Sequence, residues 1–322
     1  MLGDSLELRK PVLLIGIGKI GKNIVSKLKN DFDHDFLLIS NHKEELEVNN
    51  NSLYIDCKSW INPSTYKIRS FLESHKEELY SKLSKYQTVI VVTSLAEKAG
   101  IAVAPIVSHI AKCLLNKKVI SLVTMPFGHE KDRLFQSSIS LKRISSNSDI
   151  NFIIDNDAYV EINPHLTVED CSKITNEIIL NMIKLIPEIT LNLGINLVSG
   201  NLKENSIDVG IKELVAQLYS SLGTSSIKRS ILYVNGARNE PIGRLNEILN
   251  NFQNSMEGET NDVSFVVTDS SRNNMQLIAS IKGKTKFDFY DPLNLIPDEN
   301  VLDWDIPESH PNIDLPLPLI DW

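Results

Sequence analysis

Short apolar runs alternate with longer helical patterns over the first half of the chain. Apolar residues at helical spacing predict helices at residues 20–29, 64–84, 101–115 and 131–145. The runs that separate them predict buried strands at residues 12–16, 36–39, 89–93, 119–124 and 152–154. Strands joined by helices form a parallel, doubly wound sheet, which binds ligands at the carboxyl ends of its strands. The expected fold class is therefore α/β, with a doubly wound, Rossmann-like domain over residues 1–186.

The second half has a different order of elements. A central helix over residues 168–186 closes the first domain at Pro187, and an Asn-, Gly- and Ser-rich stretch, residues 191–206, is expected to be loop. Residues 187–205 are therefore the predicted junction between domains. Residues 206–288 are expected to form a smaller α+β domain with helices at 209–221 and 242–252 and strands at 230–234, 263–268 and 275–281.

Residues 289–322 are expected to form an acidic, proline-rich tail that is too polar to fold alone. Its last part, from Asp305 to Trp322, sets apolar residues between prolines and ends on a tryptophan. Prolines reduce the entropy lost on binding, and a terminal tryptophan gives a large anchor for a groove. The tail is thus predicted to dock on a partner protein, with folding back onto its own domain as the alternative.

Composition and charge narrow the function classes. The net charge is -8, but the chain from Phe287 onward holds nine acidic residues and no Lys or Arg, so the preceding residues carry a net charge of about +1. Nucleic-acid binding needs a clustered basic face and is disfavoured. No apolar run is long enough to span a bilayer and no secretory signal opens the chain, so direct membrane insertion is not expected and the location is expected to be cytoplasmic. Three widely spaced cysteines predict neither disulfides nor a metal site.

A glycine-rich turn follows the first predicted strand. It places Gly16, Gly18 and Gly21 in the pattern Gly-x-Gly-x-x-Gly, with Asn23 two residues on. Small residues before a helix let the backbone approach a phosphate. The second strand ends in Ser-Asn-His-Lys rather than in an acid, so a nicotinamide reading would favour the 2′-phosphate of NADP. The same glycines also suit close packing of helix on strand.

The order of motifs resembles that of FtsZ from the first strand to about residue 288. The glycine turn, the strand at residues 36–39 and the turn Thr124-Met125-Pro126-Phe127 carry the resemblance. In the second half, residues 231–236 and the following helix are similar to the strand, glycine turn and helix of the family. The resemblance implies a member of the FtsZ/tubulin superfamily.

The resemblance also implies a guanine-nucleotide pocket with GTP or GDP as its ligand. The residues at matching places are Gly16, Gly18, Gly21, Asn23, Gly100, Glu130, Arg133, Asn156 and Glu177. A carboxylate at Glu177 suits the N1 and amino donors of guanine. Ordinary solvated helix and turn residues remain the alternative for each position taken singly.

The phosphate loop of the family is rewritten in this chain. Its Gly-Gly-Gly-Thr-Gly-Thr-Gly signature aligns with residues 96–102, where only Gly100 survives. Glu97 brings a carboxylate to the place of a phosphate, which Lys98 offsets in part. Losing two or three charge-assisted hydrogen bonds weakens binding roughly a hundredfold to a millionfold. A helix with a rebuilt start is the favoured interpretation of this segment.

Hydrolysis in the family depends on acids in the loop after the central helix, which reach the neighbouring subunit. Aligning residues 205–212 with that loop puts Ile207 and Gly210 at the acidic places, with Asp208 one residue away. A shift of the alignment would let Glu204 and Asp208 serve instead.

Three hypotheses follow. The first is a cytoskeletal or cell-division protein with weak or absent GTP binding and hydrolysis, which acts by head-to-tail self-association or through its tail. The second is an active GTPase that polymerises. The third is an NADP-dependent oxidoreductase.

Overall fold

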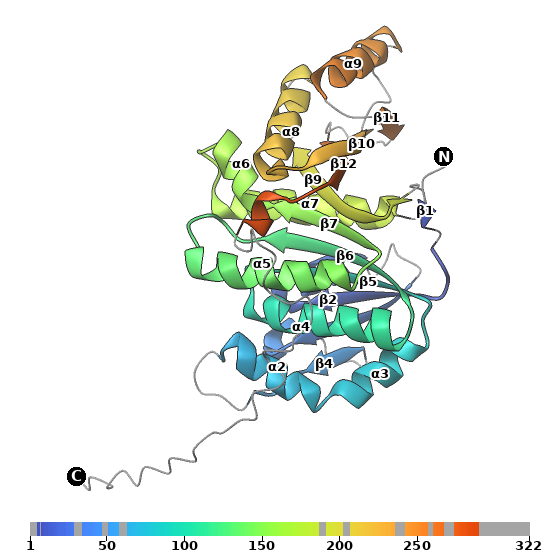
Figure 1. Ribbon diagram of the computed structural model, residues 1–322, viewed down its shortest axis with the longest axis vertical. Helices are drawn as coiled ribbons and strands as arrows, with labels where there is room; N and C mark the ends of the chain where they lie inside the picture. Colours follow the sequence, from blue (N-terminus) through green and yellow to red (C-terminus); the bar gives the residue numbers. More distant parts are fainter. Residues whose placement is uncertain are drawn as a thin grey trace, which may run out of the picture.

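One mostly parallel sheet forms the centre of the molecule (Figure 1). The computed structural model describes residues 5–6, 8–28, 34–46, 51–57, 63–186, 191–201, 207–235, 242–256, 260–266 and 274–289 of the chain. Ten strands of this part pair in the order β11-β10-β12-β9-β7-β6-β5-β2-β3-β4. Their bounds are β2 Val12–Ile17, β3 Asp35–Ser40, β4 Ser52–Tyr54, β5 Thr88–Ser94, β6 Lys118–Met125, β7 Ile150–Asp155, β9 Gly194–Asn201, β10 Ser226–Asn235, β11 Thr260–Val266 and β12 Asn274–Lys282.

The strands from β4 to β9 all run parallel, whereas β12 runs antiparallel to both β9 and β10. The predicted α/β fold with a doubly wound parallel sheet is therefore confirmed. A separate short ladder joins β1 (Ser5–Leu6) to β8 (Leu191–Asn192).

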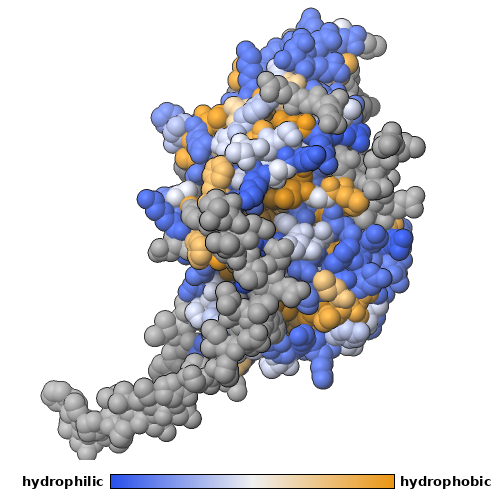
Figure 2. All heavy atoms as spheres, viewed as in Figure 1, coloured by the Kyte–Doolittle hydropathy of each residue, from blue (hydrophilic) through white to orange (hydrophobic). Residues whose placement is uncertain are grey.

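Helices cover both faces of the sheet. They are α1 Gly18–Leu28, α2 Thr65–Glu73, α3 Lys76–Ser84, α4 Lys98–His109, α5 Lys131–Ser146, α6 Asn156–Ile162, α7 Val168–Leu185, α8 Ile207–Leu222 and α9 Ile242–Ser255. Alternate strand residues point to opposite faces, so Leu13 and Ile15 pack in the core beneath α2 to α5, whereas Val12 and Leu14 pack beneath α1 and α7. The face drawn in Figure 2 shows hydrophobic side chains in small groups between hydrophilic ones.

The helix expected at residues 64–84 is two helices, α2 and α3. Hydrogen bonds at the break explain the difference: the Ser74 hydroxyl donates to the Phe71 carbonyl at 2.7 Å, and the His75 amide donates to the Leu72 carbonyl at 2.9 Å. Because a side chain and a tighter turn take these carbonyls, the regular helical pattern stops at Glu73.

The loop expected at residues 191–206 is wrong where the structure describes it, whereas the domain junction at residues 187–205 stays a prediction. Strand β9 occupies residues 194–201 and pairs with both β7 and β12, so the strands of the two halves form one sheet. Its polar residues misled the sequence prediction because they are paired inside the sheet. The Ser280 hydroxyl donates to Asn196, and Asn201 donates to Glu213 at 2.5 Å.

Candidate functional site

A cavity of about 700 Å³ opens at the carboxyl ends of β2, β5, β6 and β7. Its walls come from the start of α1, the turn after β5, the ends of β6 and β7, and the first turns of α7. The lining residues are Lys19, Ile20, Asn23, Ser94, Ala96, Glu97, Thr124, Phe127, Asn156, Val168, Glu169, Ser172, Lys173, Thr175 and Asn176. The location is the one that a parallel sheet uses for ligands.

The three glycines of the turn have two different roles. A Cβ on Gly16 would lie 2.7 Å from the carbonyl carbon of Gly21, and a Cβ on Gly21 would lie 2.3 Å from that of Gly16. These two glycines therefore let helix α1 pack directly on strand β2. Gly18 has a φ of +70°, and a Cβ there would lie 2.1 Å from Oε2 of Glu97. Gly18 thus leaves room for a carboxylate.

The carboxylate of Glu97 lies at the N-terminus of α1. Its Oε2 accepts a hydrogen bond from the backbone N–H of Lys19 at 2.9 Å. The helix holds no acidic residue in its own first turn, so Glu97 supplies the negative charge that a helix N-terminus favours. Glu97 is also the N-cap residue of α4, yet its side chain makes no hydrogen bond to that helix.

Burial raises the pKa of Glu97 to about 7. The hydrogen bond from the Lys19 amide opposes this shift, the charge of Glu45 adds to it, and a bond from the Ile20 amide and the charge of Lys19 also oppose it. Desolvation dominates because the side chain is partly buried between α1 and the turn after β5. The carboxyl group therefore changes charge near neutral pH.

The segment that aligns with the phosphate loop is mostly helix. Helix α4 begins at Lys98, directly after Glu97. A Cβ on Gly100 would lie 2.0 Å from the Ser94 carbonyl oxygen and 2.5 Å from the Thr93 hydroxyl. Gly100 is therefore needed for close packing of α4 against the end of β5, and it does not line the cavity.

Polar groups gather on the wall formed by β6, β7 and α7. Asn156 donates to the Met125 carbonyl at 2.9 Å and accepts from the Thr175 hydroxyl at 2.8 Å. Among the described residues, the buried Oγ1 of Thr124 and Oδ1 of Asn176 have no hydrogen-bond partner. Both residues line the cavity, so each offers a ligand an unused polar atom.

Glu130 and Arg133 lie beside this cavity and bind each other. Their charged groups are 2.5 Å apart, and Arg133 also donates to the Ala96 carbonyl at 3.2 Å. Together with His129 and Lys131 they line a separate cavity of about 310 Å³. The structure therefore puts this pair next to the turn that carries Glu97.

Glu177 lies outside the cavity lining. Its carboxylate pairs with Lys27 of α1 at 3.4 Å and its side chain is 41% exposed. The neighbouring Asn176 lines the cavity instead, because one residue along a helix turns a side chain by about 100°. Asn176, rather than Glu177, is the candidate partner for a base.

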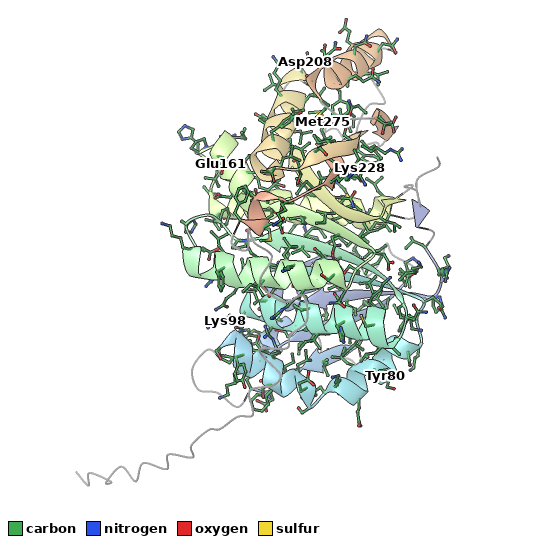
Figure 3. The ribbon with its side chains drawn as sticks, viewed as in Figure 1. Tyr80, Lys98, Glu161, Asp208, Lys228 and Met275 are labelled. Atoms are coloured by element: carbon green, nitrogen blue, oxygen red, sulfur yellow. The ribbon has the colours of Figure 1, made fainter. Side chains whose placement is uncertain are left out.

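Asp208 also lies outside the cavity lining. It sits in the first turn of α8, where Oδ1 accepts from Asn251 at 3.1 Å. Figure 3 shows it far from Lys98. The aligned segment follows β9 instead of the central helix α7, so the expected correspondence with the loop after that helix is wrong. Glu204 lies outside the described residues.

Sequence reasoning missed part of the site, namely Thr124, Glu169, Ser172, Lys173 and Thr175. The α7 residues recur at three- and four-residue spacing, so they share one face of the helix. This spacing could have predicted them as site residues if the first turns of the central helix had been placed at the sheet edge. Within the described ranges, no group of three or more His, Cys, Asp or Glu is arranged to hold a metal ion. No helix of those ranges meets the length and hydropathy that a membrane span requires.

Comparisons with known proteins agree with this architecture. The model of the Tubulin/FtsZ family, GTPase domain, matches residues 11–164. Cell division protein FtsZ 1 of Thermococcus kodakarensis is 24% identical over 249 residues, which cover 73% of this chain and 64% of that protein. The chain therefore spans less than two thirds of that relative.

Solved structures share the fold at low identity. An empty FtsZ dimer of M. jannaschii has a TM-score of 0.64 at 16% identity, covering 83% of this chain and 87% of that one. CetZ2 of Haloferax volcanii, a GTPγS-bound protofilament, has a TM-score of 0.62 at 16% identity, covering 87% and 96%. Residues 11–164 thus match a GTPase domain of the Tubulin/FtsZ family, and the described fold is the one that the FtsZ and CetZ2 structures share. These likenesses give the oxidoreductase interpretation no support.

Proposed function

We propose that this protein is an FtsZ/tubulin-like cytoskeletal protein that acts by head-to-tail self-association, with weak or absent GTP binding and hydrolysis. Two relatives of the same fold support self-association, because one was solved as a dimer and the other as a protofilament. Its place of action is the cytoplasm, and a role in cell division follows from the name of the relatives.

The position of Glu97 is the observation that carries the weak-binding part of the proposal. A nucleotide phosphate needs the free N–H groups at the start of α1, and the Glu97 carboxylate already accepts one of them at 2.9 Å. At a pH above about 7 the Glu97 carboxyl group is charged, so it and a phosphate in the same place repel each other. The remaining cavity walls still offer unused polar atoms at Thr124 and Asn176. The polar atoms support a pocket that can still bind a base, and the position of Glu97 supports the loss of phosphate binding.

The direction of the chain supports the absence of hydrolysis. Helix α7 starts at the cavity, and β9, which follows it, runs parallel to β7. Helix α8 and Asp208 come after β9, so they lie at the same edge of the sheet as the cavity. In a head-to-tail contact, the residue that completes a neighbour's pocket must lie at the opposite edge. Asp208 is therefore not placed to activate water on a neighbour's nucleotide.

An active, polymerising GTPase is the second candidate. The 700 Å³ cavity favours it, because its volume and location suit a nucleotide. Residues 305–322 are further proposed to dock on a partner protein, although they lie outside the described residues.

Phosphate release and sedimentation, measured together over a range of protein concentrations, test this function. The purified chain is compared with GTP, with GDP and without nucleotide. We expect assemblies that grow with protein concentration in all three conditions and no phosphate release above a buffer control. Release that rises with protein concentration would establish the active GTPase instead. A monomer at every concentration would contradict self-association.

A further inference from the structure

The N-terminus of α1 is an anion site whose occupant belongs to the chain itself. We propose that the Glu97 carboxylate is an internal ligand of this site, where it takes the place of a nucleotide phosphate and so keeps phosphates out of the cavity. This inference rests on the proposed function and deepens it, because it names one side chain as the cause of weak nucleotide binding.

Three contacts show that the turn is built around this carboxylate. The Lys19 amide donates to Oε2 at 2.9 Å, and the nearby Ile20 amide also favours the charged carboxylate. Gly18 takes a positive φ at the one place where a Cβ would collide with Oε2. Glu97 caps α1, which is 78 residues away in sequence, although it stands at the N-cap of α4. The Glu97 side chain therefore caps α1 and not α4, the helix at whose N-terminus it stands.

A second observation points to a missing ligand. Thr124 is 1% exposed, lines the same cavity, and has no partner for its hydroxyl among the described residues. A buried hydroxyl without a partner is unfavourable, so a bound group that reaches it gains a hydrogen bond. The cavity thus offers both a blocked anion site and an unused polar atom.

The charges around Glu97 would favour a phosphate in its absence. The groups that surround it are Lys19 on α1, Glu45 of the 3₁₀ turn Lys43–Glu45, Lys98 on α4, the Glu130–Arg133 pair on α5 and the Glu169–Lys173 pair on α7. Each of the two ion pairs is neutral in sum. Lys19 and Lys98 then outnumber Glu45, which leaves a local positive charge once Glu97 is removed.

Binding of GDP and of guanosine to the full-length chain tests the proposal, with guanosine as the ligand that lacks phosphate. The variant Glu97→Gly restores the glycine that the family has at this place. Glycine is tolerated at an N-cap, and Glu97 makes no cap bond to α4, so the variant should fold. We expect GDP to bind it at least about tenfold more tightly than it binds the wild type. Guanosine affinity should change less than about threefold, because guanosine brings no negative charge.

Two further variants separate charge from volume. Glu97→Gln removes the charge and keeps the side chain, so it should give a smaller gain for GDP than Glu97→Gly. Glu45→Gln removes a nearby carboxylate that accepts a hydrogen bond from Ser40 of β3, and GDP affinity should change less than about threefold. If Glu97→Gly is unfolded by circular dichroism, Glu97→Gln carries the test alone, and a GDP gain above that of Glu45→Gln supports the proposal.

Unchanged GDP affinity in a folded Glu97 variant would overturn the inference. An equal gain for guanosine would also overturn it, because the side chain would then only crowd the cavity. Neither result would contradict the proposed self-association, because both concern nucleotide binding alone. Conversely, tight GTP binding by the wild type would contradict the proposed function directly, whatever the variants do.

Discussion

The ammonium nitrogen of Lys286 lies 2.5 Å from Oδ2 of Asp155. Asp155 ends strand β7 in the first half of the chain, and Lys286 starts the last described turn, Lys286–Asp288. The Asp155 side chain is 4% exposed, and the same oxygen accepts from the Ser221 hydroxyl of α8 at 2.6 Å. This ion pair therefore ties the end of the described chain to the central sheet.

Replacing Lys286 by methionine should leave the buried Asp155 carboxylate without a positively charged partner. We expect the free energy of unfolding to fall by about 3–5 kcal/mol, measured by urea denaturation. The double variant Asp155→Asn with Lys286→Met should lose less than the two single losses combined. The exposed pair Arg229–Asp262 is the control, since Asp262→Asn should change stability by less than about 1 kcal/mol. A comparable loss in both pairs would contradict the structural role.

Stability should depend on pH through Glu97. Its pKa is raised from 4.5 to about 7, so the folded protein keeps a proton that the unfolded chain releases between these values. The stability contributed by this group is therefore complete at low pH and is lost as pH rises through about 7. Relative to Glu97→Gln, the wild-type free energy of unfolding should fall by up to about 1.4 kcal/mol per pH unit over this range. Parallel urea midpoints of the two proteins at every pH would refute the shift.

Gly18 should resist substitution more than an ordinary helical glycine. Gly18→Ala forces a Cβ into a positive-φ residue and against Glu97, and we expect a loss of about 1–3 kcal/mol by thermal unfolding. The loss should shrink, but not vanish, when Glu97 is also alanine. Gly243 of α9 is the matched control, because a Cβ there meets nothing within 4 Å and alanine is the better helix former. Equal tolerance at both glycines would contradict the packing described at Gly18.

Tyr159 carries a hydroxyl that the fold does not use. The residue is 1% exposed, and the hydroxyl has no hydrogen-bond partner among the described residues. Burial, aided by the nearby charges of Asp155 and Cys171, raises the pKa of Tyr159. Tyr159→Phe should therefore leave stability unchanged or raise it by up to about 1 kcal/mol. A loss of more than that, seen in the melting temperature, would show that the hydroxyl has a partner.

Substitutions at Asn176 and at Glu177 should have different effects on the affinity for guanosine. Asn176→Ala removes the unused Oδ1 from the cavity, so guanosine affinity should fall about tenfold in an equilibrium titration. Glu177→Gln alters a side chain that pairs with Lys27 outside the cavity, and the affinity should stay within about twofold. The reverse ranking would restore Glu177 as the base-binding residue.

The sequence by itself determined the parallel α/β core and the ligand-binding edge. Strands such as Val12–Ile17 and Thr88–Ser94 are buried on both faces, so they read as continuous apolar runs, and the glycine turn marks where the first of them meets a helix. Strand β9 escaped notice because its buried Asn196 and Ser199 resemble loop residues. Only the neighbouring strand supplies the partner that makes such residues acceptable inside a sheet.

Only the tertiary structure decided which side chains face the cavity. Residue types indicated that Glu97 stands where a phosphate would be, but the hydrogen bond that its carboxylate accepts from the Lys19 amide joins positions 78 residues apart. The choice between Asn176 and Glu177 depended on the rotation of α7 against the sheet, which the sequence pattern leaves open to within one residue. Local propensity fixes helices and strands, whereas the direction in which a side chain points across a cavity is set by packing between distant elements.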